Sequence, residues 1–494
     1  MNVNGAFFSK YELQISYFCV LLLLLISSFL ILNNANWIFD LFWADDYQLL
    51  FSTAIGRPSH SYTGSGRFWP LGLCDYSLLL AIPFGTTVKA HFLYNCTTMI
   101  VACLLLFSTL RKIVRRSYIA LFCMPILFLS SSFILIHMSC IYPERQMFLM
   151  LCTFLFFYYK ASHESNHFRD YAIAFLSAVY TTYLKEPVFG LWLAFACSNL
   201  IFGNLKKNER KFNYSLIINS LIWICIYVYR TIYRDRTLID GLKGYGAVSA
   251  DSSVNVISNF VTFFQNDHVL YIFSAIAVIR LISILQNKES YNSCTDGVLF
   301  AGLSYAGAFL LLNMGSCHYF FPTIVLSLPA MAVAINQSKR FCLKYIIAIL
   351  IVICSFCSAN VSSSWIHQIS MLRVKDHALF LDLIQRSKLG NKILWITDKE
   401  NDQMIENSRK VEQMKFRRYQ IFFDYYSGAA TKGSHFPFVM TSDYSQITAH
   451  TIIICSDETL NSECGKAIMN KIDSAGLSLM LYHKDIGAKV FAKN

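Results

Sequence analysis

Two adjacent carboxylates, Asp45 and Asp46, stand just beyond the first long apolar segment of the chain. Aromatic residues flank them on both sides: Trp37, Phe39, Phe42, Trp43, Tyr47 and Phe51. Such rings can partly shield a pair of acids from water, and neighbouring carboxylates raise the pKa of one of the two. A carboxylate with a raised pKa is suited to general-base catalysis. A hydrated loop pair without a chemical role is the alternative.

An arginine among aromatic residues follows in the segment Gly66-Arg67-Phe68-Trp69-Pro70. The guanidinium of Arg67 could hold two phosphate oxygens in a fork, with the neighbouring rings against a lipid chain or a sugar. An arginine that extends to lipid headgroups at a membrane surface would have the same surroundings. Arg67 is therefore a candidate for phosphate binding, and the headgroup alternative stays open.

Two short charged turns, Tyr142-Pro143-Glu144-Arg145 and Lys185-Glu186-Pro187, lie between apolar runs. Burying a charged group at membrane depth costs free energy unless an ion-pair partner or water solvates it. Such residues therefore mark candidate functional sites. Because the turns are short, we expect Glu144 and Arg145 to face the cavity that the two aspartates border. We expect Lys185 and Glu186 to repeat this arrangement. An ion pair with a purely structural role is the alternative.

Two further groups are weaker candidates. His318, beside Tyr319 in a late turn, could reach a phosphate, although a lone interfacial histidine is more often structural. The segment from about 231 to 267 could bind an anion or form a solvated face; its charged residues are Arg234, Asp235, Arg236, Asp240 and Lys243. The sequence contains no G-x-S-x-G, Walker A, H-E-x-x-H or dinucleotide-binding motif, so nucleotide hydrolysis does not power the mechanism.

The elements that must position these residues are membrane helices. The chain of 494 residues is 55% hydrophobic and 15% charged, whereas soluble domains carry about 25% charged residues. We predict a polytopic α-helical membrane protein with about eleven spans. The first span covers about 15–32, and the others cover about 90–109, 117–137, 146–159, 170–184, 187–202, 214–231, 268–285, 297–314, 319–336 and 344–360.

The net charge of +12 is concentrated in alternate connections, which indicates the positive-inside rule and not a nucleic-acid partner. The basic segments are 111–116, 206–211 and 339–344, with Lys160 and Lys288 on the same side. We therefore expect a cytoplasmic N-terminus, with the charged turns on the opposite, periplasmic face. The C-terminus also lies on that face. An interfacial or re-entrant helix is expected at about 71–84.

The chain divides into a membrane domain, residues 1–360, and a soluble α/β domain, residues 361–494. The first outer loop covers about 33–89. The second domain contains β-rich runs at 392–397, 437–441, 451–455 and 477–481 and helical patterns at 365–386 and 458–475. Most of the 16 cysteines lie in apolar runs and act as small hydrophobic residues. Cys455 and Cys464 could form a disulfide outside the cytoplasm.

The paired acids after the first span, the second acidic turn and the soluble outer domain resemble the GT-C class of integral membrane glycosyltransferases. Within that class, Ala44-Asp45-Asp46-Tyr47, Gly66-Arg67-Phe68-Trp69-Pro70 and Pro143-Glu144-Arg145 are most similar to bacterial and phage-encoded O-antigen glucosyltransferases of the serotype-converting type. The resemblance covers the layout of most of the chain.

The resemblance implies transfer of a sugar, glucose in the similar enzymes, from a polyprenyl-phosphate donor to an O-antigen or related glycan at the periplasmic face of the bacterial inner membrane. It maps the general base onto Asp45 or Asp46. We prefer Asp45, with Asp46 as its partner, and the choice between them stays open. Arg67 and Arg145 would stabilise the leaving phosphate. No cofactor is expected, and a divalent metal is compatible with the acids but not required. The implied partners are the lipid bilayer, a flippase and a donor-synthesising glycosyltransferase.

Two other classes of protein remain alternatives. An O-antigen polymerase has a similar number of spans and arginine-bearing outer loops, but it needs neither the paired acids nor a large outer domain. A lipid-linked glycan transporter or flippase would favour broken helices with charges at the middle of the membrane, and the predicted spans contain few such charges. The glycosyltransferase interpretation therefore ranks first.

Overall fold

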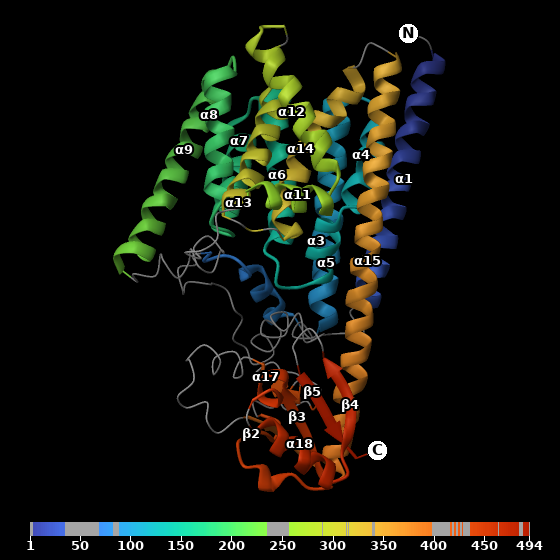
Figure 1. Cartoon of the computed structure of the whole chain (residues 1–494). Coiled ribbons are helices and arrows are strands. Elements are labelled where there is room, and N and C mark those ends of the chain that lie inside the picture. Colours follow the sequence, from blue (N-terminus) through green and yellow to red (C-terminus); the bar gives the residue numbers. More distant parts are fainter. Residues whose placement is uncertain are drawn as a thin grey trace. The chain divides into compact units, whose positions relative to one another are not determined.

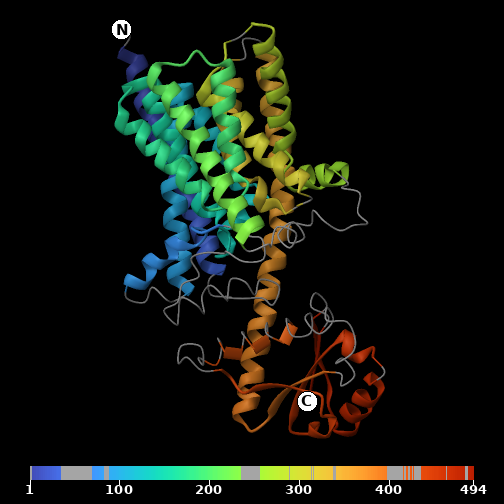
Figure 2. The ribbon, with the colours of Figure 1, turned by 90° about the vertical axis from the view of Figure 1, so that its left-hand side faces the viewer.

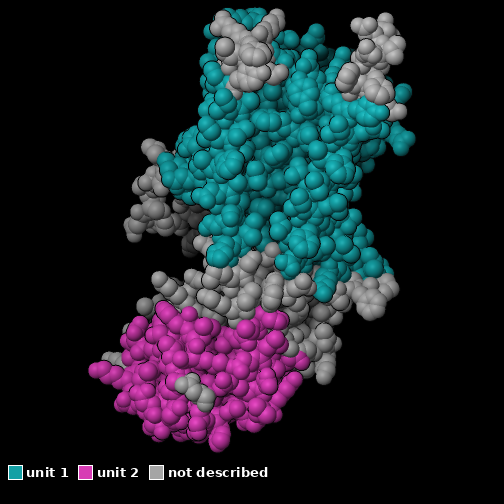
Figure 3. All heavy atoms as spheres, turned by 90° about the vertical axis from the view of Figure 1, so that its right-hand side faces the viewer, with its two compact units in different colours: residues 1–35, 59–85, 89–367 teal, residues 36–58, 86–88, 368–494 magenta. Residues whose placement is uncertain are grey.

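The computed structural model describes most of the chain: residues 3–34, 69–82, 88–234, 256–288, 290–312, 314, 316–337, 341–397, 415–416, 419–420, 423–424, 427, 435–462, 464–483 and 488–493. The predicted residues Asp45, Asp46 and Arg67 lie outside this part, as does the 235–243 stretch of the anion-binding segment. The chain forms two compact units (Figure 3), which are residues 1–35, 59–85 and 89–367, and residues 36–58, 86–88 and 368–494.

The first unit is a bundle of helices (Figures 1 and 2). Its elements in chain order are α1 (Val3–Asn34), η2 (Cys74–Ala81), α3 (Val88–Val114), α4 (Ser117–Phe128), α5 (Ser131–Met138), α6 (Glu144–Tyr159), η3 (Lys160–Ser165), α7 (Phe168–Thr182), α8 (Val188–Phe202), α9 (Lys207–Val228), η4 (Tyr229–Arg234), α11 (Val256–Asn266), α12 (Val269–Leu285), η5 (Ser293–Gly297), α13 (Val298–Leu311), η6 (Cys317–Phe320), α14 (Phe321–Gln337) and α15 (Phe341–Lys388), the last of these as far as residue 367. Every predicted span coincides with one of these helices or with a broken pair of them. The sequence predicts the positions of these helices because each is an apolar run, and a helix forms all its backbone hydrogen bonds within itself.

Membrane-spanning length is a stricter criterion than helix formation. Six helices of the described part are long and apolar enough to cross a bilayer, and the number rises to eight if each of two bent pairs is one span. Helices α6, α7 and α8 have 16, 15 and 15 residues, fewer than the roughly 20 that a perpendicular span needs. The figure of about eleven spans therefore stays a prediction.

The predicted span 117–137 is broken. Helices α4 and α5 meet at a bend of 64°, because the Ser130 side chain accepts a hydrogen bond from the backbone N–H of Phe133 and starts a new helix there. Asp267 accepts further hydrogen bonds from the N–H groups of Ser131 at 2.9 Å and Ser132 at 3.2 Å. A carboxylate at the start of α5 satisfies these donors, so Asp267 has a capping role that the sequence did not indicate.

The basic connections meet at one end of the bundle. Lys112 Nζ lies 2.8 Å from Glu164, Lys206 Nζ donates to the Ser162 carbonyl at 3.2 Å, and Asn336 donates to the Val114 carbonyl at 3.1 Å. We call this end the basic end. Helix α6 begins at Glu144 and runs toward it, so the charged turn at residues 142–145 lies at the other end, which we call the turn end. This arrangement agrees with the charge alternation on which the predicted orientation rests.

The second unit contains a five-stranded sheet in the order β2-β1-β3-β5-β4. Strands β1 (Lys392–Ile396), β2 (Phe438–Thr441) and β3 (Thr451–Ser456) are parallel neighbours, whereas β5 (Ala488–Ala492) pairs antiparallel with β3 and with β4 (Ser478–His483). Its other helices in the described residues are η9 (Tyr444–Gln446), α17 (Asp457–Leu460), α18 (Gly465–Ser474) and the part of α15 after residue 367. Four strands match the predicted runs. The short strand β5 was not predicted.

One expectation for the second half of the chain is corrected. The predicted span 344–360 and the predicted helix 365–386 are one continuous helix, α15, of 48 residues. No glycine or proline interrupts the sequence between 341 and 388, so nothing ends the helix at Val361. The possible disulfide between Cys455 and Cys464 stays a prediction.

Candidate functional site

Glu144 and Lys185 form a buried ion pair at the turn end. Helix α6 begins after Pro143, and Glu144 in its first turn is favoured by the helix dipole. Lys185 lies in the turn between α7 and α8, and its ammonium donates to Glu144 Oε1. Glu144 is 0% exposed and Lys185 is 5% exposed. The structure thus brings the two predicted charged turns into direct contact.

Arg145 binds a carboxylate that the sequence analysis did not select. Its Nη1 donates to Asp75 Oδ2 at 2.6 Å, and both side chains are buried. Asp75 lies in η2, and Leu71, three residues before η2 begins, donates from its backbone N–H to the Tyr183 carbonyl at 3.1 Å. The two charged residues of the 142–145 turn therefore pair with different partners and not with each other.

The guanidinium of Arg145 also contacts two aromatic rings. Its Cζ lies 3.9 Å from the centroid of the Tyr76 ring and 5.6 Å from that of Tyr94. Tyr76 donates to Asn95 Oδ1 at 2.9 Å and to the Cys140 carbonyl at 3.0 Å. Burial raises the pKa of Tyr76 well above its usual range, so its phenol stays protonated and remains a donor. These contacts fix the plane of the guanidinium.

Several polar atoms of this site are buried and unused. Arg145 Nε and Nη2, Glu144 Oε2 and Asp75 Oδ1 have no hydrogen-bond partner in the described part of the chain. Buried polar groups are nearly always hydrogen-bonded, so such exceptions need an explanation. The Nε and Nη2 atoms of this fixed guanidinium carry three N–H groups, which could donate to the oxygens of an anion.

Aromatic rings connect Lys185 to His318. The Lys185 ammonium lies 4.2 Å from the centroid of the Tyr319 ring, and Tyr319 lies 3.9 Å from the His318 ring. His318 contacts Tyr142 at 4.3 Å between ring centroids, and its Nδ1 lies 2.7 Å from Ser316 Oγ. Glu186, which follows Lys185, is buried as well. All described candidates from the charged turns thus lie at the turn end.

Sequence reasoning missed Asp75 and Tyr76 as members of the site. The available signal was an aspartate, Asp75, within the apolar segment 71–84, where an interfacial or re-entrant helix is expected. Its partner, Arg145, is 70 residues away in the sequence, and no local pattern links the two.

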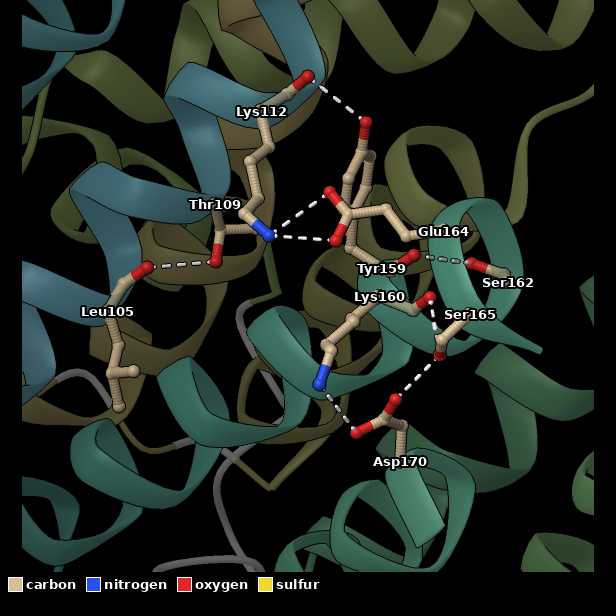
Figure 4. A network of polar contacts seen from close by, with 9 residues as sticks. All are labelled: Leu105, Thr109, Lys112, Tyr159, Lys160, Ser162, Glu164, Ser165 and Asp170. Atoms are coloured by element: carbon tan, nitrogen blue, oxygen red, sulfur yellow. Dashed lines mark hydrogen bonds and ion pairs between the residues drawn. The ribbon is translucent and has the colours of Figure 1, made fainter. Parts of the chain in front are cut away.

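The basic end carries ion pairs of another kind. Figure 4 shows Lys112 beside Glu164 and Lys160 beside Asp170. Lys112 Nζ reaches both carboxylate oxygens of Glu164, at 3.0 and 2.8 Å. Asp170 accepts from Lys160 at 3.1 Å and from Ser165 at 2.6 Å. In the described residues, no group of three or more histidine, cysteine or acidic side chains could hold a metal ion.

No protein-family model and no curated protein matches this sequence. Solved structures do match. The crystal structure of ArnT from Cupriavidus metallidurans bound to undecaprenyl phosphate is 8% identical over 96% of this chain and 97% of that chain, with a TM-score of 0.51. The oligosaccharyltransferase of Archaeoglobus fulgidus in complex with zinc and sulfate is 10% identical over 95% of this chain and 73% of that chain, with a TM-score of 0.47.

At such low identity, the likeness to ArnT concerns the fold alone. It confirms the predicted fold class, which is a polytopic α-helical membrane protein with the GT-C-like arrangement and a C-terminal sheet domain. The more specific likeness to serotype-converting O-antigen glucosyltransferases stays a prediction.

Proposed function

We propose that this protein transfers a sugar from a polyprenyl-phosphate donor to a glycan acceptor, with the turn end of the bundle as the active-site face. The observation that carries the proposal is Arg145, which is buried in the bundle with Nε and Nη2 lacking partners among the described residues. A lipid phosphate would supply the missing acceptors. The ArnT structure that shares this fold was determined with undecaprenyl phosphate, which supports a donor of this class.

The reaction would proceed by direct displacement. The acceptor hydroxyl attacks the anomeric carbon of the donor sugar while the bond from that carbon to the phosphate oxygen breaks. The aspartate base, Asp45 with Asp46 as its partner, takes the hydroxyl proton, and the bonding electron pair leaves with the phosphate. Arg145 and Arg67 stabilise the charge on the leaving phosphate. Asp75 and Tyr76 hold Arg145 in position.

Glu144, Lys185, Glu186 and His318 would form the rest of the binding surface. Lys185 is a second cation at the turn end, and its pairing with Glu144 fixes the ammonium beside Tyr319. We propose glucose as the sugar and O-antigen or a related glycan as the acceptor, on the sequence resemblance. From the charge alternation and the change of composition along the sequence, we propose a periplasmic active site, a cytoplasmic N-terminus, a membrane domain at 1–360 and a periplasmic domain at 361–494. A metal is not required by this scheme.

The proposal is tested by the composition of O-antigen in cells that express the wild type, Asp45→Asn or Asp46→Asn at matched membrane levels. Loss of a general base lowers the rate by about 10²–10⁴-fold, so one of the two variants should lose the added sugar. Lys112→Ala, at the basic end, is the matched control and should retain it. If both aspartate variants still add the sugar, the base assignment is wrong.

The same experiment distinguishes the alternatives. A polymerase would change the length of the O-antigen without adding a sugar residue to each repeat. A flippase would leave the composition of the glycan unchanged and alter only which face of the membrane carries the lipid-linked precursor.

A further inference from the structure

A large polar cavity lies at the basic end, apart from the candidate active site. Its volume is about 660 Å³, and its wall is formed by the end of α3, by α6 and η3, by α12 and η5, and by the end of α14. The lining residues are Ile113, Arg115, Tyr159, His163, Arg280, Lys288, Ser290, Asn292, Cys294, Thr295, Val333 and Gln337. No carboxylate occurs among these described lining residues.

The basic side chains of this cavity differ in their pairing. Arg280 is held in a fork by Asp296, with Nε–Oδ1 and Nη2–Oδ2 distances of 2.7 Å each, so its charge is compensated. Arg115 and Lys288 form no ion pair with any carboxylate in the described part of the chain. Elsewhere at this end, Lys112 and Lys160 have acidic partners. Among the described residues, the cavity is therefore lined by two cations whose charge no carboxylate compensates.

The backbone presents both cations from the ends of helices. Arg115, just after α3, has a φ of 54°, and Asn287, just before Lys288, has a φ of 55°. Residues other than glycine rarely adopt this left-handed conformation. Both positions lie just beyond the end of a helix, and Arg115 and Lys288 line the cavity together with the polar side chains of Ser290, Asn292 and Thr295.

The cavity also lies at the ends of candidate membrane spans. Helices α3 and α14 are both candidate spans, and the lining residues Ile113 and Gln337 are close to their C-terminal ends. Ile113 and Val333 add apolar lining. Basic pockets between membrane helices are suited to phosphate-bearing lipid headgroups.

We propose that this cavity binds the headgroup of an anionic phospholipid, with Arg115 and Lys288 on its phosphate and Ile113 and Val333 beside the first carbons of its acyl chains. This site is separate from the proposed transferase site and does not depend on it. The bound lipid would fix the segments that follow α3 and α12 at the lipid surface.

The test measures lipid binding to the full-length protein by native mass spectrometry, with phosphatidylglycerol and phosphatidylcholine as probes. The variant Arg115→Asn/Lys288→Gln removes both cations, and asparagine tolerates the left-handed backbone at position 115. Each cation near a lipid surface contributes roughly fivefold, so phosphatidylglycerol should bind about 25-fold more weakly to this variant. Binding of phosphatidylcholine should not change.

The matched control is Arg210→Gln/Lys211→Gln, which removes two cations of the same end outside the cavity. It should keep the affinity for phosphatidylglycerol within about twofold, and Arg115→Lys/Lys288→Arg should also bind normally. Equal losses in the cavity variant and the control would overturn the site, because they would indicate a general charge effect. If glycerol 3-phosphate in solution raises the melting temperature of the wild type as much as phosphatidylglycerol does, the lipid source is wrong.

Discussion

The two ends of α6 hold ion pairs of opposite character. At the start of the helix, Lys185–Glu144 and Arg145–Asp75 join side chains that are at most 6% exposed. Beyond its last residue, Lys160 is 38% exposed in its pair with Asp170, and Lys112 and Glu164 are 24% and 40% exposed. The 16 residues of α6 separate the two regions by about 24 Å.

This difference shows which charges have a functional explanation. Exposed pairs contribute little to stability and need no special role. A buried pair costs desolvation of both ions and is often no better than an apolar pair. The buried pairs at the turn end also leave several polar side-chain atoms without a hydrogen-bond partner among the described residues. This favours a ligand-binding role for that end.

The largest effect is expected from breaking the Lys185–Glu144 pair. Lys185→Met leaves the Glu144 carboxylate buried without its cation, which should destabilise the protein by about 3–5 kcal/mol. Urea or thermal unfolding of the detergent-solubilised protein measures this change. The double variant Glu144→Gln/Lys185→Met should recover most of the stability, because no isolated charge remains. A double variant as unstable as the single one would show that the pair is a net stabilising element.

The next effect concerns Arg145 and should appear in activity. Arg145→Lys keeps the positive charge but loses the planar fork and the stacking on Tyr76. We expect transfer from polyprenyl-phosphate-glucose in isolated membranes to fall by about 10²–10³-fold. The level of folded protein should stay close to that of the wild type. Unchanged activity of this variant would remove Arg145 from the proposed site.

A smaller effect is expected from Tyr76→Phe. The variant keeps the ring beneath Arg145 but removes the hydrogen bonds to Asn95 Oδ1 and the Cys140 carbonyl. The loss should be about 1–3 kcal/mol, since it leaves buried acceptors unsatisfied. Unfolding of the detergent-solubilised variant would measure it. Tyr118→Phe, at an exposed position of the basic end, is the control and should be almost neutral.

The smallest effect is expected at the basic end. Lys112→Ala breaks the partly exposed pair with Glu164 and should cost no more than about 1 kcal/mol. Transfer activity should be unchanged, and the small stability difference should shrink further at 1 M salt. A loss of several kcal/mol in this variant would contradict the contrast between the two ends.

The comparison also explains how far sequence reasoning reached. Apolar length located the helices at the predicted spans, because a helix satisfies its own backbone and needs no distant partner. The same reasoning failed for Asp267, whose carboxylate caps α5 across 136 residues of sequence. It also failed for β5, a short strand held by its pairing with β3 and β4.

For the site, the sequence by itself determined which turns carry buried charge, since four ionisable residues in two short connections must find partners. Only the tertiary structure decided the pairing, Lys185 with Glu144 and Arg145 with Asp75. The physical reason is that residue composition sets the cost of burying a charge, whereas the partner that offsets this cost is chosen by packing between distant segments.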